Sequence, residues 1–171
     1  MKFQVGDRVV HPVYGVGTIR SLGRQQFSGA PARQYYEVKT GGPTVWVPID
    51  EHGATVLRAI AAKESLDACR KILKSRPVRF EKDRQLRQAD LTRRLGVKSL
   101  PSLCETVRDL RADGELKPLG KADDDLLKRI SKAMCDEWAA AEGVTFQVAQ
   151  DEIESLLAQA QGRRSTRERL Q

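Results

Sequence analysis

The pattern of apolar residues changes near residue 61, and this change constrains the fold more than any other feature of the sequence. Before it, short segments alternate apolar and polar residues and are rich in β-branched and aromatic side chains, as is typical of strands. After it, apolar residues recur every three or four positions, as is typical of amphipathic helices. The sequence therefore predicts an α+β protein, with a small antiparallel β domain over residues 1–60 and an all-helical bundle domain over residues 61–162.

The first domain is predicted to contain short strands separated by glycine- and proline-rich turns. Gly41, Gly42 and Pro43 separate two such segments in the manner of a hairpin loop. Such short strands in so small a domain favour a strongly curved antiparallel sheet or barrel of the Tudor or SH3 kind. The predicted strands cover residues 3–10, 15–22, 33–40 and 44–48, with a last short piece near 56–57.

The second domain is predicted to contain four or five helices. A first helix ends before Pro77, and a second covers residues 80–95. A third begins after Ser99, its expected N-cap, and stops at Asp113-Gly114. A fourth is centred on residues 127–138, and Thr145 is expected to cap a fifth. Residues 163–171 are polar and basic, and we expect them to form a flexible tail.

Basic residues are concentrated at one place in the helical half. Residues 70–98 contain 11 Lys and Arg residues against Glu81, Asp83 and Asp90, a local excess of +8, whereas the whole chain carries +7. Such a stripe is typical of a surface that binds a polyanion such as nucleic acid. The alternative is an ordinary solvated helix surface.

The sequence contains no recognisable motif for catalysis, cofactor binding or metal binding. There is no phosphate-binding loop, and Gly15-Val16-Gly17 is not followed by the third glycine of a dinucleotide fingerprint. The two histidines lie apart, and the three cysteines are scattered without a metal-ligand spacing. We therefore expect no enzymatic activity, no cofactor, no bound metal and no small-molecule substrate.

Neither a membrane segment nor a signal peptide is expected. No run approaches the roughly 18 consecutive apolar residues that a spanning helix needs. The first residues lack the apolar stretch and cleavage site of a secretion signal. We expect a cytoplasmic protein without a membrane partner.

The segment Val5-Gly-Asp-Arg-Val-Val-His-Pro-Val-Tyr-Gly-Val-Gly-Thr-Ile19 resembles the opening of bacterial transcription regulators of the CarD/CdnL family. Its continuation Val-Val-His-Pro-x-Tyr-Gly is the most specific part. Tyr35-Tyr36 and Val45-Trp46-Val47-Pro48 fall where that family places its third and fourth strands, and Glu105–Leu110 is similar to its E-V-V-R-D-L segment. The resemblance covers roughly residues 1–160 and includes a polymerase-interaction domain that transcription-repair coupling factors share.

The resemblance implies that residues 1–60 bind a lobe of the RNA polymerase β subunit. By strand position, the contacts are expected from Arg24 or Gln25 and from Trp46. Val45 and Val47 share the face opposite to Trp46, so we expect the two valines to point inward and the tryptophan outward. Aromatic residues are enriched at interface hot spots.

The resemblance also implies that the helical domain binds promoter DNA at the upstream edge of the melted region. Family members carry a tryptophan at the start of the second helix, but this sequence has Asp83 there. Phe80, one turn earlier, is either a substitute for this wedge or an ordinary core residue. The residues expected at DNA are Arg76, Arg79, Phe80, Lys82, Arg84, Arg87, Arg93, Arg94 and Lys98.

Together these expectations describe a nucleoid-associated regulator that tethers RNA polymerase to promoter DNA and stabilises the open promoter complex. Its DNA contacts would be largely sequence-independent, because phosphates carry no base code. The alternative is a protein-interaction adaptor that binds polymerase and does not contact DNA. Target promoters, oligomeric state and the direction of regulation do not follow from the sequence.

Overall fold

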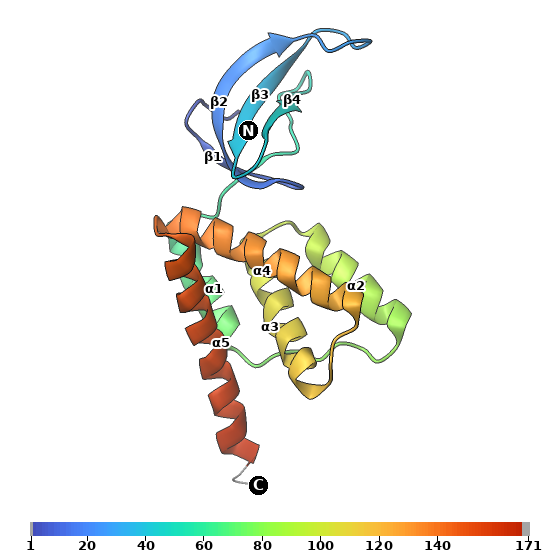
Figure 1. Cartoon of the computed structure of the whole chain (residues 1–171), viewed down its shortest axis with the longest axis vertical. Coiled ribbons are helices and arrows are strands. Elements are labelled where there is room, and N and C mark those ends of the chain that lie inside the picture. The colour runs from blue at the N-terminus through green and yellow to red at the C-terminus, as the bar shows by residue number, and fades with distance from the viewer. Residues whose placement is uncertain (1, 169–171) are drawn as a thin grey trace. The chain divides into compact units, whose positions relative to one another are not determined.

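The computed structural model describes the backbone of residues 2–168 and the side chains of residues 2–160. The chain divides into two compact units with the boundary between Ile60 and Ala61 (Figure 1). The first unit is an antiparallel five-stranded sheet and the second is helical, which confirms the predicted α+β class. Each unit has its own buried apolar cluster.

The first unit is a β domain in the strand order β4-β3-β2-β1-β5. Figure 1 shows β2 and β3 as long, curved strands. The ladder between them is irregular between Ile19 and Ser21, and a bulge at this point bends the sheet. The strands are β1 (Arg8–His11), β2 (Gly15–Gln25), β3 (Arg33–Thr40), β4 (Thr44–Pro48) and β5 (Arg58–Ala59).

One face of this sheet covers a small apolar core. Val9, Ile19 and Val38 are almost completely buried there. The Tyr36 hydroxyl lies at the edge of the core and accepts a hydrogen bond from the Phe3 backbone N–H at 3.0 Å, which ties the N-terminal segment to β3. A side chain at residue 17 would not fit, so the glycine there allows β2 to approach β3 closely.

The second unit contains a 3₁₀ turn and five α-helices. The central helix, α3, packs against α1, α2 and α4 and has buried residues on nearly every side. Trp138 of α4 is fully buried in the same core. The elements are η1 (Lys63–Ser65), α1 (Leu66–Lys74), α2 (Arg84–Gly96), α3 (Leu100–Leu116), α4 (Lys121–Glu142) and α5 (Phe146–Glu168).

The expected helix caps at Ser99 and Thr145 are both confirmed. The Ser99 hydroxyl accepts a hydrogen bond from the Ser102 N–H, and the Thr145 hydroxyl accepts one from the Val148 N–H, each at 3.3 Å. Each hydroxyl therefore satisfies one N–H group that a helix start leaves without a partner.

Three predicted helix boundaries were wrong. The α2 helix begins at Arg84 rather than Phe80, because the Asp83 carboxylate accepts hydrogen bonds from the N–H groups of residues 85 and 86 and caps the helix. The α3 helix runs past the expected stop to Leu116, and Leu119 packs against Gly114. The α5 helix continues through Glu168, so residues 163–168 of the expected tail are helical, and residues 169–171 lie outside the described residues.

Across the described residues, none of the helices combines the length and apolar character required to span a membrane.

Candidate functional site

The basic stripe of residues 70–98 is divided between buried ion pairs and the exposed surface. Arg87 contacts Asp113 at 2.6 Å and Asp123 at 2.8 Å. Arg94 contacts Asp90 at 2.9 Å and Asp109 at 2.6 Å. Their side chains are only 18% and 11% exposed, so these two arginines join helices and present little charge at the surface.

The electrostatics of Arg94 fit such a structural role. Burial alone lowers the pKa of its guanidinium, but the hydrogen bonds to Asp109 and Asp90 outweigh this effect and the pKa is raised. The pKa of Arg87 is raised in the same way, with burial opposed by Asp113 and Asp123. Both groups therefore remain charged inside the domain because each has two carboxylates beside it.

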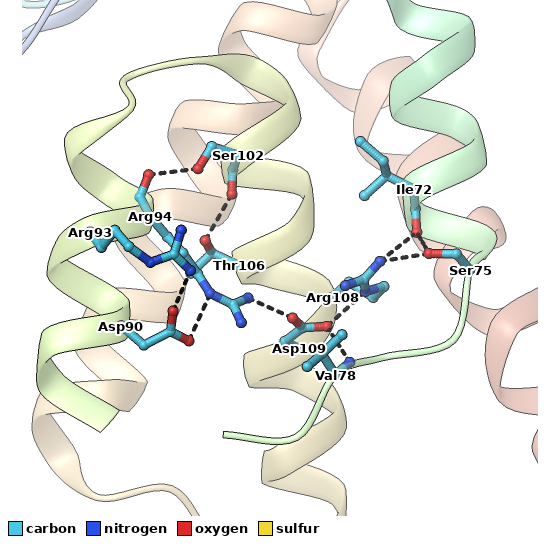
Figure 2. A network of polar contacts seen from close by, with 10 residues as sticks. All are labelled: Ile72, Ser75, Val78, Asp90, Arg93, Arg94, Ser102, Thr106, Arg108 and Asp109. Atoms are coloured by element: carbon cyan, nitrogen blue, oxygen red, sulfur yellow. Dashed lines mark hydrogen bonds and ion pairs between the residues drawn. The ribbon is translucent and has the colours of Figure 1, made fainter. Parts of the chain in front are cut away.

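Asp109 is the centre of a buried polar network (Figure 2). Its carboxylate is completely buried and accepts hydrogen bonds from Arg94, from Arg108 Nε at 2.7 Å and from the Val78 backbone N–H at 2.9 Å. Arg108 in turn donates to the Ser75 hydroxyl at 2.6 Å. Figure 2 shows these contacts joining α2, α3 and the end of α1. The network therefore fixes the linker of residues 75–83 at two points.

Six of the predicted DNA-binding cations remain exposed, and we call them the exposed cation set. Arg93 forms a surface ion pair with Asp90, with its side chain 70% exposed. No ion pair joins any of the other five to another residue of the described part of the chain. The set consists of Arg76, Arg79, Lys82, Arg84, Arg93 and Lys98.

Phe80 is a core residue and not an exposed wedge. It is 8% exposed and belongs to the helical core. The guanidinium carbons of Arg87 and Arg94 lie 4.7 and 4.8 Å from its ring centroid, so two cation–π contacts cover it. The interpretation of Phe80 as a DNA wedge is therefore corrected, and Asp83, where the family has tryptophan, acts as a helix cap.

Trp46 is the exposed aromatic residue of the outer strand β4. It is 38% exposed, whereas Val47 is buried and Val45 packs against the core. The predicted arrangement of inward valines and an outward tryptophan is confirmed. Glu37 of β3 lies opposite Trp46 in the register and accepts a hydrogen bond from the Ser21 hydroxyl at 2.6 Å.

The strand register places Arg24 and Gln25, the two residues at the end of β2 that were predicted to contact polymerase, on opposite faces of the sheet. Gln25 pairs with Arg33, which shares a face of β3 with Glu37, so Gln25 and Trp46 are on the same face of the sheet. Arg24 pairs with Gln34 and therefore lies on the opposite face. Both are exposed, but the register favours Gln25 as the residue that shares a surface with Trp46.

Several exposed apolar residues of the β domain were not anticipated as surface features. Val13 is 77% exposed and Tyr14 49%, at the turn between β1 and β2. The His11 Nδ1 atom accepts hydrogen bonds from the N–H groups of both residues, at 3.0 and 3.2 Å, and thereby fixes this turn. Phe27, beyond the end of β2, is 44% exposed. Their position in turns was visible in the sequence and could have indicated exposure.

The comparison with known families agrees with the architecture of the first unit. Residues 3–61 match the family model of the CarD-like/TRCF RID domain, which spans all five strands. The resemblance noted from the sequence is thereby confirmed for the β domain. This domain mediates interaction with RNA polymerase, which makes the chain a transcription-related protein. The N-terminal domain is therefore similar to the RNA polymerase-interaction domain that CarD-like proteins and transcription-repair coupling factors share.

Proposed function

We propose that this protein links the β subunit of RNA polymerase to promoter DNA and thereby stabilises the open promoter complex, acting by binding and not by catalysis. The observation that carries the proposal is the exposed cation set in a chain whose other domain is a polymerase-interaction domain. A nucleoid-associated, cytoplasmic location follows from this role.

The polymerase contact is proposed at β4 and the adjoining face of the sheet. β4 is at one end of the strand order, and no other strand of residues 2–168 pairs with its outer edge. An outer strand can pair with a strand of a partner, and a neighbouring aromatic side chain can supply the hot spot. Trp46 and Gln25 are the proposed side-chain contacts.

The DNA contact is proposed at the linker before α2 and along that helix. Arg76, Arg79, Lys82 and Arg84 lie within nine consecutive residues, and the hydrogen bonds of Asp109 and Arg108 hold this linker in place. Cations on a fixed backbone lose less conformational entropy when they bind phosphates. Contacts of this type add affinity and steer association largely without regard to base sequence.

Stabilisation of the open complex requires a difference in affinity. A ligand shifts an equilibrium between two states only to the extent that it binds one of them more tightly. Tethering to polymerase places the exposed cation set near the upstream duplex, and we propose that this contact is better formed in the open complex than in the closed one.

The adaptor function is the second candidate, and one observation favours it. Phe80 is buried and Asp83 replaces the family tryptophan, so the described residues of the α2 start offer no exposed aromatic wedge for DNA. Under this alternative, the exposed cation set serves solubility, and the helical domain binds another protein.

Binding of the full chain to promoter duplex at several salt concentrations separates the two functions. The proposed function predicts a linear fall of log affinity with log salt, and the triple variant Arg76→Gln/Arg79→Gln/Lys82→Gln should reduce the slope by about 2.7. The control variant Lys117→Gln/Lys121→Gln/Arg129→Gln removes the same charge from other exposed positions and should keep the slope. A wild-type slope near zero would rule out direct DNA contact and leave the adaptor function.

The polymerase end has its own test. Trp46→Ala should weaken capture of the full chain by RNA polymerase by about 30-fold, as expected for a hot spot worth 2 kcal/mol. Phe146→Ala removes an aromatic side chain of the same exposure, 38%, from the start of α5 in the helical unit and serves as the control. Equal capture of both variants would contradict the proposed contact at β4.

A further inference from the structure

The outer face of α2 has an ordered arrangement of side chains. Successive residues of an α-helix are about 100° apart around its axis. On this basis, Gln85, Gln88, Ala89 and Thr92 form a stripe beside the buried Leu91, centred about 110° from it around the axis, and all four are exposed. Arg84 and Arg93 lie on the two edges of the stripe, about 180° apart around the axis. The same six residues line one shallow surface depression.

We propose that this face of α2 lies in the major groove of duplex DNA, with Arg84 and Arg93 on phosphates and Gln85 and Gln88 at base edges. The inference rests on the proposed DNA contact and adds to it a preference for particular bases. Because the two arginines are about 180° apart around the axis, one points toward each side of the groove when this face of the helix lies in it.

The chemistry of the stripe fits bases better than a protein surface. Its centre holds two amides, a hydroxyl and a methyl group and no large apolar or aromatic residue, whereas the centres of protein interfaces are enriched in aromatic side chains. A glutamine amide donates and accepts hydrogen bonds together and can pair with N6 and N7 of adenine in the major groove. Ala89 and Thr92 are small enough to let the helix approach closely.

The charge distribution around the helix supports the same partner. The acidic residue within α2, Asp90, forms ion pairs with Arg93 and Arg94, and its side chain is 27% exposed. A surface ion pair such as Arg93–Asp90 contributes little, so Arg93 can exchange this partner for a phosphate. The outer face is therefore neutral at its centre and cationic at its edges.

The buried face of α2 holds the outer face in a fixed orientation. Arg87 is joined to Asp113 and Asp123, Arg94 is joined to Asp109, and Leu91 is buried. A site that reads bases needs this rigidity, because its side chains must meet hydrogen-bonding groups at fixed positions.

The test is selection by the full chain from a pool of duplexes with randomised central positions, followed by sequencing. The wild-type protein should enrich a short motif containing adenine, bound about fivefold or more tightly than unselected duplex. Gln85→Ala/Gln88→Ala should abolish the enrichment but retain the affinity for unselected duplex and its salt slope. Gln147→Ala/Gln159→Ala, at two exposed positions of α5, is the matched control and should enrich the wild-type motif.

Two further measurements assign the groove and the phosphate contacts. Replacing the preferred adenine by 7-deazaadenine removes a major-groove acceptor and should abolish the preference. Arg84→Gln/Arg93→Gln should lower the salt slope by about 1.8 and leave the motif unchanged.

The outcomes separate this inference from the proposed function. Salt-dependent binding of wild-type protein without any enriched motif overturns the inference alone. A motif that persists in Gln85→Ala/Gln88→Ala, or that tolerates 7-deazaadenine, also overturns it. Absence of salt-dependent binding overturns the proposed DNA contact and the inference with it. Circular dichroism of the variants verifies that each has folded.

Discussion

Replacing Asp109 by Asn should greatly destabilise the helical domain. The carboxylate is completely buried between two guanidinium groups that are themselves 8% and 11% exposed. The amide has nearly the same shape, so packing is preserved, but the negative charge is lost. Arg108 then keeps only neutral acceptors, the Ser75 hydroxyl and the Ile72 carbonyl. One amide oxygen must also replace two carboxylate oxygens that accept three hydrogen bonds.

The expected loss in the free energy of unfolding is about 3 to 5 kcal/mol. This is the usual effect of removing one partner from a buried ion pair, because the remaining charge stays desolvated. Small domains have free energies of unfolding of about 5 to 15 kcal/mol, so the loss is a large fraction of the total. With a denaturant slope of about 1.5 kcal/mol per M, the urea midpoint should fall by about 2 to 3 M.

The assay is urea unfolding followed by tryptophan fluorescence. In a Trp46→Phe background, Trp138 is the remaining tryptophan, and its burial in the helical core makes it report on that domain. Asp124→Asn is the matched control, because the Asp124–Lys128 pair is exposed and its loss should leave the urea midpoint almost unchanged. A loss below about 1 kcal/mol for Asp109→Asn would refute the role assigned to this network.

Three further predictions concern single positions. Desolvation lowers the pKa of His11 below its usual 6.5, so its contribution to stability is complete above pH 6.5 and lost as the pH falls through the folded-state pKa. As the pH is lowered below 6.5, the free energy of unfolding of the β domain should fall in the wild type but not in His11→Asn. The measurement is unfolding followed by Trp46 fluorescence in a Trp138→Phe background. Gly17→Ala should cost about 1 to 3 kcal/mol in urea unfolding, because the new methyl would lie 2.6 Å from Val38 Cγ1, whereas Gly23→Ala meets no atom within 4 Å. Lys98 has φ of 51°, in the left-handed region that Asn adopts more readily than Lys. Lys98→Asn should therefore raise the free energy of unfolding, measured by thermal unfolding, by up to about 1 kcal/mol. The same change removes a cation and should lower the affinity for DNA.

The arrangement of elements was predictable because apolar periodicity depends on local geometry. The inward Val47 and outward Trp46 follow from strand alternation alone, and Ser99 was recognisable as a cap. Boundaries that depend on tertiary packing were not predictable in this way. Gly114 is typical of a helix stop, yet it lies inside α3, where Leu119, five residues further along the chain, packs against it. Asp83 could have been recognised as an N-cap from its residue type and position.

The candidate DNA site was only partly predictable, because a charge count does not show which charges are buried. The contact between Asp90 and Arg94 has the spacing of neighbours on one helix and was visible in the sequence. The contacts of Arg94 with Asp109 and of Arg87 with Asp123 join residues 15 and 36 positions apart. No local pattern indicates such pairs, so the sequence did not show that carboxylates hold these two arginines away from the surface.

The burial of Arg87 and Arg94 in ion pairs lowers the positive charge at the surface that DNA could contact, although the net charge of the chain stays the same. Each lies between two carboxylates, so their charges are cancelled within a few ångströms and contribute little field outside the domain. Eight phosphate contacts would give a salt slope of about −7.2, whereas the six exposed cations give at most about −5.4. A measured slope no steeper than about −5.4 would therefore agree with the burial of these two arginines, and a steeper one that returns to about −5.4 in Arg87→Gln/Arg94→Gln would show that their ion pairs open when DNA binds.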